Sequence, residues 1–206
     1  MRKSMCISYE VDTGLYINIT NKCSNRCSFC IRNNGDGAYG SDSLWLEREP
    51  TREEILESVF SRDVGKYSEI VFCGYGEPSY RLEDAVFVAK KIKDKFPDMK
   101  LRINTNGQSD LILGGRTAPL YEGAFDTVSI SLNSSNAEKY QKMCHSVYGK
   151  EAFKAILDFT KDVKNYVQNV LLSVVRETLT EEELEECYAI ASSVGVTLKV
   201  RTYISA

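Results

Sequence analysis

The sequence has few of the features that mark membrane proteins, secreted proteins and histidine-based sites. No stretch of the 206 residues approaches the ~18 consecutive apolar residues of a membrane span, and the N-terminus lacks the apolar core of a signal peptide. His145 is the only histidine, so any mechanism that needs a histidine base must use it. The seven cysteines are an odd number, which disfavours a disulfide framework and favours the reducing environment of the cytoplasm.

Strong charge of one sign and low-complexity segments are also absent. The net charge is −3 at pH 7 with both signs interspersed, so nucleic acid is not an expected partner. Repeats and linkers are missing, and the fractions of hydrophobic residues (43%) and charged residues (27%) are ordinary for a globular protein. We therefore expect residues 1–206 to form a single domain with a sizeable core.

The spacing of apolar residues predicts an N-terminal β-hairpin followed by alternating strands and helices. The hairpin is expected to join residues 5–11 to residues 15–20. Capping boxes at Thr51–Glu54 and Thr180–Glu183 predict the starts of two helices, and Gly195 suits the end of the second. The later strands are expected at 69–73, 100–104, 126–132, 170–175 and 196–203. This alternation predicts an α/β fold with a parallel sheet, but it does not distinguish an open doubly wound sheet from a partial barrel.

Three cysteines, Cys23, Cys27 and Cys30, form a C-x3-C-x2-C run directly after the hairpin. Three thiolates on one loop can hold three corners of a metal cluster, and no fourth cysteine or histidine lies nearby in the sequence. A structural zinc site closes with four ligands, and ferredoxin patterns supply four cysteines per cubane. A cubane held by three cysteines leaves one iron open to a substrate. The alternatives are a redox thiol cluster and a zinc site that borrows His145 or Cys73.

Residue types that bind ligands gather where the predicted strands end. Glycines after the strand at 69–73 allow a ligand to approach the backbone closely. Ser131 and Asn133 are expected to point the same way on a strand and would suit ribose hydroxyls, while Arg176 or Arg201 would suit a carboxylate. Since the carboxyl ends of parallel strands lie together, these residues should share one site. That predicted site comprises Gly74, Tyr75, Gly76, Glu77, Pro78, Asn106, Ser131, Asn133, Ser173, Arg176 and Arg201.

These motifs resemble those of the radical S-adenosylmethionine (radical SAM) superfamily. The signature of that family is C-x3-C-x-aromatic-C, and Phe29 fills the aromatic position. Gly74–Pro78 resembles the family's Gly-Gly-Glu-Pro segment, with Tyr75 in place of the second glycine. Asn104–Gly107 and Ser129–Asn133 resemble the turn after its third strand and the ribose contact of its fourth. In its length and in the sequence of residues 15–23, the chain is most similar to the small TatD-associated radical SAM proteins.

The resemblance implies a partial (β/α)6 TIM-like barrel and a [4Fe–4S] cluster on the three cysteines. The open iron would bind S-adenosylmethionine, and an electron from flavodoxin or ferredoxin would cleave it to a 5′-deoxyadenosyl radical that abstracts hydrogen from a substrate. Phe29 and the strand-end residues would contact S-adenosylmethionine. In this setting Cys144 is the candidate to donate a hydrogen atom to a radical, with a semi-buried structural cysteine as the alternative.

We therefore expect an oxygen-sensitive cytoplasmic enzyme that has no membrane partner. Because no additional cluster domain is expected and the glycine-rich loop 33–40 should be mobile, a bulky substrate such as a peptide or protein is favoured, with a small molecule under a loop as the alternative. The rival interpretation is a non-catalytic iron–sulfur or zinc module for redox or sensing. Such a module would explain the cysteines but has no use for Gly76–Pro78 or Ser129–Asn133.

Overall fold

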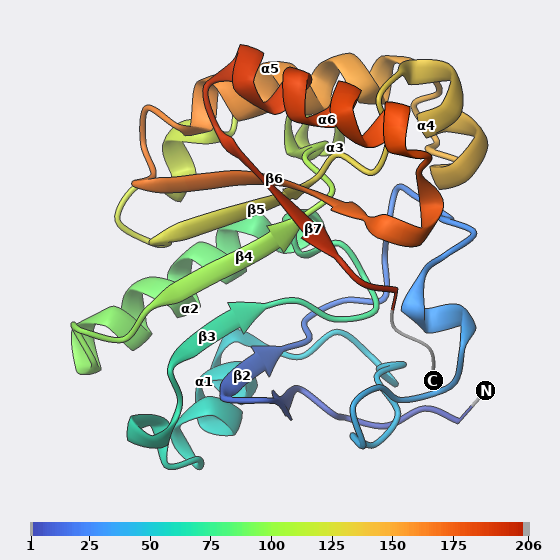
Figure 1. The fold of residues 1–206 in the computed structure, drawn as a ribbon. Helices are drawn as coiled ribbons and strands as arrows, with labels where there is room; N and C mark the ends of the chain where they lie inside the picture. The colour runs from blue at the N-terminus through green and yellow to red at the C-terminus, as the bar shows by residue number, and fades with distance from the viewer. Residues whose placement is uncertain (1, 204–206) are drawn as a thin grey trace.

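The computed structural model describes residues 2–203, which form a seven-stranded sheet with helices packed along one face (Figure 1). The strands follow one another across the sheet in sequence order, from β1 to β7. β1 is antiparallel to β2, and every later pair of neighbours is parallel. A doubly wound sheet would reverse its strand order, so the observed order agrees with the predicted partial barrel.

The strands occur in the predicted order, and the hairpin strands and the last strand are shorter than predicted. The strands are β1 (Ser8–Val11), β2 (Gly14–Ile17), β3 (Glu69–Phe72), β4 (Leu101–Thr105), β5 (Thr127–Ser131), β6 (Asn169–Val175) and β7 (Thr197–Arg201). The α-helices are α1 (Arg52–Phe60), α2 (Leu82–Lys95), α3 (Ser109–Leu113), α4 (Ala137–Cys144), α5 (Glu151–Val163) and α6 (Glu181–Val194). Short 3-10 helices are η1 (Ile31–Asn33), η2 (Val64–Lys66), η3 (Pro78–Arg81), η4 (Ala118–Tyr121) and η5 (Arg176–Thr178).

Two helices begin and end where the capping signals predict. Thr51 and Thr180 each accept a hydrogen bond from the backbone N–H three residues later, and the glutamate there bonds back to the threonine N–H. This reciprocal capping satisfies backbone donors that a helix leaves unpaired at its start. Gly195 ends α6 in the left-handed conformation, with φ of 75°. None of the helices described is long and apolar enough to cross a lipid bilayer.

The two faces of the sheet differ sharply in polarity, because successive residues of a strand point to opposite sides. Apolar side chains on one face pack against the helices, as do Phe72, Ile103 and Ile130. The alternate residues form the opposite, concave face of the partial barrel, and several of them are polar. On this face the guanidinium of Arg102 forms an ion pair with the carboxylate of Glu69, with 2.6 Å between Nη2 and Oε1.

The strand before the cysteines ends three residues earlier than predicted. β2 ends at Ile17 and not at Thr20, because Asn18 leaves the strand and its side-chain amide donates to the carbonyl of Leu44 at 2.8 Å. Residues 18–30 then run beside α4, which lies far along the chain (Figure 1). The cysteine loop is thus placed at the carboxyl ends of the strands.

Candidate functional site

The cysteine loop is docked on the C-terminal turn of α4. The backbone N–H groups of Arg26 and Ser28 donate to the carbonyls of Cys144 and Met143 at 2.8 and 2.9 Å. The last carbonyls of a helix have no partner within it, so the loop and the helix end satisfy each other. This pairing fixes the backbone on both sides of Cys27.

A buried polar network holds the same loop from inside. The hydroxyl of Tyr140 accepts hydrogen bonds from the side-chain amides of Asn25 at 2.9 Å and Gln108 at 2.8 Å. Gln108 also donates to Asn25 at 3.0 Å and accepts from the hydroxyl of Ser146 at 2.9 Å. No pattern in the sequence predicts this network, because its members come from separate segments and belong to no motif with a known ligand.

Glu77 connects the glycine-rich segment to the turn after β4. Its fully buried carboxylate accepts from the hydroxyl of Thr105 at 2.7 Å, from the N–H of Asn106 at 2.6 Å and from both donors of Ser79. Burial raises the pKa of Glu77, and these hydrogen bonds act in the opposite direction. The amide of Asn106 in turn donates to the hydroxyl of Ser24 at 2.8 Å, which links this turn to the cysteine loop.

The three cysteines carry thiols that burial keeps protonated in the absence of a metal. Burial raises the pKa of Cys23 to about 12 and that of Cys30 above its ordinary value. A hydrogen bond with the thiol of Cys144, together with burial, raises the pKa of Cys27. Thiolates form at such positions when a metal replaces the proton, so the loop suits metal binding better than free thiolate chemistry.

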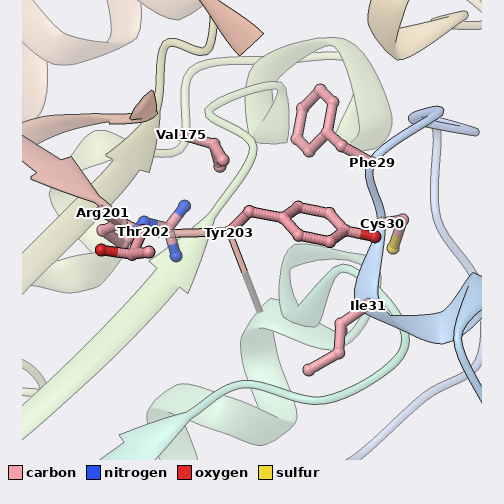
Figure 2. Close-up of a pocket in the computed structure, with 7 residues that line it drawn as sticks. All are labelled: Phe29, Cys30, Ile31, Val175, Arg201, Thr202 and Tyr203. Carbon is pink, nitrogen blue, oxygen red and sulfur yellow. The ribbon is translucent and has the colours of Figure 1, made fainter. Parts of the chain in front are cut away.

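A cavity of about 180 Å³ adjoins the third cysteine, between the cysteine loop and the ends of β6 and β7 (Figure 2). The Nε atom of Arg201 is buried and has no hydrogen-bond partner among the described residues. An unsatisfied buried donor of this kind fits an anionic group of a ligand. The lining residues are Phe29, Cys30, Ile31, Val175, Arg201, Thr202 and Tyr203.

The structure distinguishes the two candidate arginines. Arg201 points into the cavity beside Cys30. Arg176 is partly exposed, donates to the carbonyl of Leu179 at 3.0 Å and pairs with Glu181. Arg201 is therefore the better placed of the two to bind a ligand carboxylate.

The glycines at 74 and 76 are required by the packing of the protein itself. A Cβ on Gly76 would lie 2.2 Å from the carbonyl oxygen of Thr20, and one on Gly74 would lie 2.1 Å from the Oδ1 of Asn18. The glycines were predicted to let a ligand approach the backbone closely. In the structure, the segment that precedes the cysteines makes this close approach. Contact of Gly74–Pro78 with a cofactor stays a prediction.

The side chains of Ser131 and Asn133 were expected to point the same way because both residues were predicted to lie on one strand, and this premise is wrong. β5 ends at Ser131, and Asn133 lies beyond it with φ of 57°, so strand alternation does not apply. The amide of Asn133 donates to the sulfur of Cys144 at 3.8 Å, and its buried Oδ1 has no partner among the described residues. Ser173 is buried, and its hydroxyl donates to the carbonyl of Ile130 at 3.4 Å.

Cys144 is fully buried at the end of α4, in contact with Cys27. It does not line the cavity beside Cys30. Its role as a hydrogen-atom donor stays a prediction, and its burial favours the alternative of a structural cysteine.

The residues near the loop fit a cluster with an open position better than a closed mononuclear site. Within residues 2–203, no three His, Cys, Asp or Glu side chains are arranged to hold a single metal ion. His145 is exposed, and Cys73 lies on the concave face beside Asn104. The loop supplies three thiols. Asn133, whose Oδ1 has no partner among the described residues, lies next to Cys144. Arg201, whose Nε has none, lines the same cavity as Cys30. These features fit a cluster together with a polar ligand.

The chain matches the model of a known protein family over most of its length. The model of the radical SAM superfamily matches residues 17–191, which include the cysteine loop and five of the seven strands in whole or in part. The chain belongs to the radical SAM superfamily. The predicted superfamily is therefore confirmed, and with it the cofactors typical of the family, a [4Fe–4S] cluster and S-adenosylmethionine. Membership of the TatD-associated group stays a prediction.

Curated relatives carry the name GTP 3′,8-cyclase. The probable GTP 3′,8-cyclase of Thermococcus kodakarensis is 26% identical over 189 residues, which are 91% of this chain and 56% of that protein. The probable enzyme of Methanosarcina acetivorans is 32% identical over 134 residues, which are 64% of this chain and 36% of that protein. The chain thus spans about half the length, or less, of the curated relatives it matches.

Solved structures share the fold at low sequence identity. Streptococcus suis SuiB bound to S-adenosylmethionine has a TM-score of 0.66 and 14% identity, covering 94% of this chain and 41% of SuiB. A radical SAM methyltransferase from Sphaerobacter thermophilus has a TM-score of 0.64 and 13% identity, covering 95% of this chain and 68% of that protein. These likenesses confirm the predicted partial-barrel fold.

Proposed function

We propose that residues 1–206 form a radical SAM core domain that cleaves S-adenosylmethionine to begin a radical reaction on a substrate. The observation that carries the proposal is the cysteine loop, docked on α4 beside a cavity that contains the unpartnered Arg201. A reduced [4Fe–4S] cluster, when bound, supplies the electron that cleaves S-adenosylmethionine into methionine and a hydrogen-abstracting 5′-deoxyadenosyl radical. Flavodoxin or ferredoxin is the proposed electron donor, and the cytoplasm the proposed location.

The residues of this chain bind and orient the two cofactors. Cys23, Cys27 and Cys30 would hold three irons, and the hydrogen bonds to α4 keep the loop in place before a cluster arrives. Arg201 would bind the carboxylate of S-adenosylmethionine, because a guanidinium matches that group in charge and geometry. Phe29 offers the cavity an aromatic wall.

The test is an anaerobic assay on protein with a reconstituted cluster. Iron, sulfide and zinc are measured first, then S-adenosylmethionine and dithionite are added and the nucleoside product is identified by mass. We expect 5′-deoxyadenosine from the wild type and none from Cys27→Ala. 5′-Methylthioadenosine would indicate transfer of a 3-amino-3-carboxypropyl group. Zinc in place of iron, or an intact four-iron protein that leaves S-adenosylmethionine uncleaved, would favour the non-catalytic redox or sensor module.

GTP is the first substrate to test, because the curated relatives are named GTP 3′,8-cyclases. A peptide is the second, since SuiB was solved bound to a precursor peptide. We expect the true substrate to increase the yield of 5′-deoxyadenosine over the substrate-free reaction. If neither GTP nor the peptide changes that yield, neither is the substrate, and the proposed cleavage activity itself is unaffected.

A further inference from the structure

Residues 31–42, which we call the crossing loop, run from the cysteine loop across the open side of the sheet. The sheet does not close, because β1 and β7 are both edge strands. The hydroxyl of Tyr203, after β7, accepts from the Nδ2 of Asn34 at 3.1 Å and donates to its Oδ1 at 3.2 Å. The crossing loop thereby connects the cysteine segment to the far edge of the sheet.

One end of the loop's glycine-rich stretch is held by Tyr75. The Tyr75 hydroxyl lies 3.0 Å from the carbonyl of Gly35 and 2.9 Å from that of Gly37. Its ring is buried and packs edge-on against Trp45, with ring centroids 5.2 Å apart. Tyr75 is the residue that departs from the family's Gly-Gly-Glu-Pro pattern, so this departure has a structural consequence.

The other anchor, Tyr203, lies directly beside the candidate site. Its backbone N–H donates to the carboxylate of Glu177 at 2.7 Å, which fixes the chain after β7. Its ring extends toward Cys30 and lines the same cavity as Arg201 (Figure 2). A movement of Tyr203 would therefore change access to the third cysteine.

We propose that Tyr75 and Tyr203 are positioning residues that hold the crossing loop closed over Cys30 and the concave face. The glycine content of residues 33–40 predicts mobility, and the two hydroxyls counteract it with bonds that are individually weak. Such a loop opens locally without unfolding of the core. This inference rests on the proposed function. The closed loop favours a small substrate, which it can enclose, and disfavours a bulky partner such as a protein.

The test uses cluster-free protein and measures how fast each cysteine reacts with iodoacetamide. Tyr75→Phe and Tyr203→Phe keep the rings and remove only the hydroxyls. We expect each variant to raise the alkylation rate of Cys30 about fivefold, the effect of losing one ordinary hydrogen bond. Cys23, which does not line the cavity, serves as the reference within the same molecule. Tyr188→Phe, on an exposed tyrosine of α6, is the matched control and should change neither rate.

Two results of the alkylation experiment would overturn the proposal. One is an unchanged Cys30 rate in both variants, and the other is an equal rise at Cys23 and Cys30, which would indicate general loosening. Hydrogen exchange gives a second readout, because the N–H of Leu44 donates to the carbonyl of Asp36 at 2.7 Å. That amide should exchange faster in Tyr75→Phe, and an unchanged rate would also count against the proposal. Neither measurement requires a cluster, so a wild type that fails to cleave S-adenosylmethionine would overturn the proposed function alone.

Discussion

Asn25 donates a hydrogen bond from its side-chain amide to the hydroxyl of Tyr140 at 2.9 Å, although the two residues are 115 positions apart in the sequence. The same hydroxyl accepts from Gln108 at 2.8 Å, so one oxygen atom joins the cysteine loop, the turn after β4 and helix α4. All three side chains are almost fully buried. The cysteine loop is therefore anchored to the folded core by buried hydrogen bonds.

Tyr140→Phe tests this network. The change keeps the ring but leaves two buried amide donors with one partner fewer, so we expect the free energy of unfolding to fall by about 2 kcal/mol. Urea denaturation of cluster-free protein measures it, with Tyr188→Phe as the control because that hydroxyl is on an exposed residue. A loss below about 0.5 kcal/mol, the size of an ordinary surface change, would mean that the network does not stabilise the loop.

Arg201→Gln tests the binding of the cofactor carboxylate. Removing the guanidinium from the cavity should weaken the binding of S-adenosylmethionine about tenfold, the effect of one lost charge-assisted hydrogen bond. Equilibrium dialysis on the cluster-loaded protein gives the Kd. Arg176→Gln is the matched control and should leave the Kd within about twofold, since Arg176 pairs with Glu181. The assignment is wrong if Arg176→Gln weakens binding more than Arg201→Gln does.

The sequence predicts the parts of this site that depend on neighbouring residues in the chain. The two capping boxes and the order of the strands follow from local patterns, and the structure has the helix starts and the strands in the predicted places, although several strands are shorter than predicted. The fold class also follows, because the alternation of strands and helices and the family resemblance agree.

The contacts between distant segments could not be predicted in this way. Glycines at 74 and 76 indicated a close approach, but only the fold reveals that the nearest atoms belong to Asn18 and Thr20. Asn133 adopts a left-handed conformation just past β5. No residue pattern near it predicts that β5 ends at Ser131. The partners of Gln108 are likewise brought together only by the sheet.

Asp84→Asn gives a pH-dependent prediction. Asp84 lies in the first turn of α2 and accepts from Arg52 at 2.5 Å and Arg81 at 2.8 Å, while Arg81 also donates to the carbonyl of Ile19. Partial burial acts to raise the pKa of Asp84, but the two guanidinium groups outweigh it and hold the pKa below its ordinary value. The stabilisation is therefore present above the unfolded pKa of about 3.9 and is lost as the pH falls through the lower folded pKa.

We expect Asp84→Asn to lower the free energy of unfolding by about 1 kcal/mol at pH 7. The difference from the wild type should shrink as the pH falls below about 4. Urea denaturation at a series of pH values measures both quantities, and Asp94→Asn, on an exposed carboxylate paired only with Lys91, is the control. A difference that stays constant down to pH 2 would contradict the assignment of the effect to ionised Asp84.

Gly76→Ala tests whether the glycine-rich segment supports the cysteine loop directly. The added Cβ would lie 2.2 Å from the carbonyl oxygen of Thr20 and 2.7 Å from that of Lys22, the residue before Cys23. Backbone must move to relieve such contacts, so we expect a loss of about 3 kcal/mol in unfolding free energy and a reconstituted protein that retains less iron. Gly65→Ala is the matched control, because its Cβ would meet nothing closer than 3.7 Å. If Gly76→Ala unfolds like the wild type and holds a full complement of iron, Gly76 does not position the cysteine loop, and a ligand must explain the glycine instead.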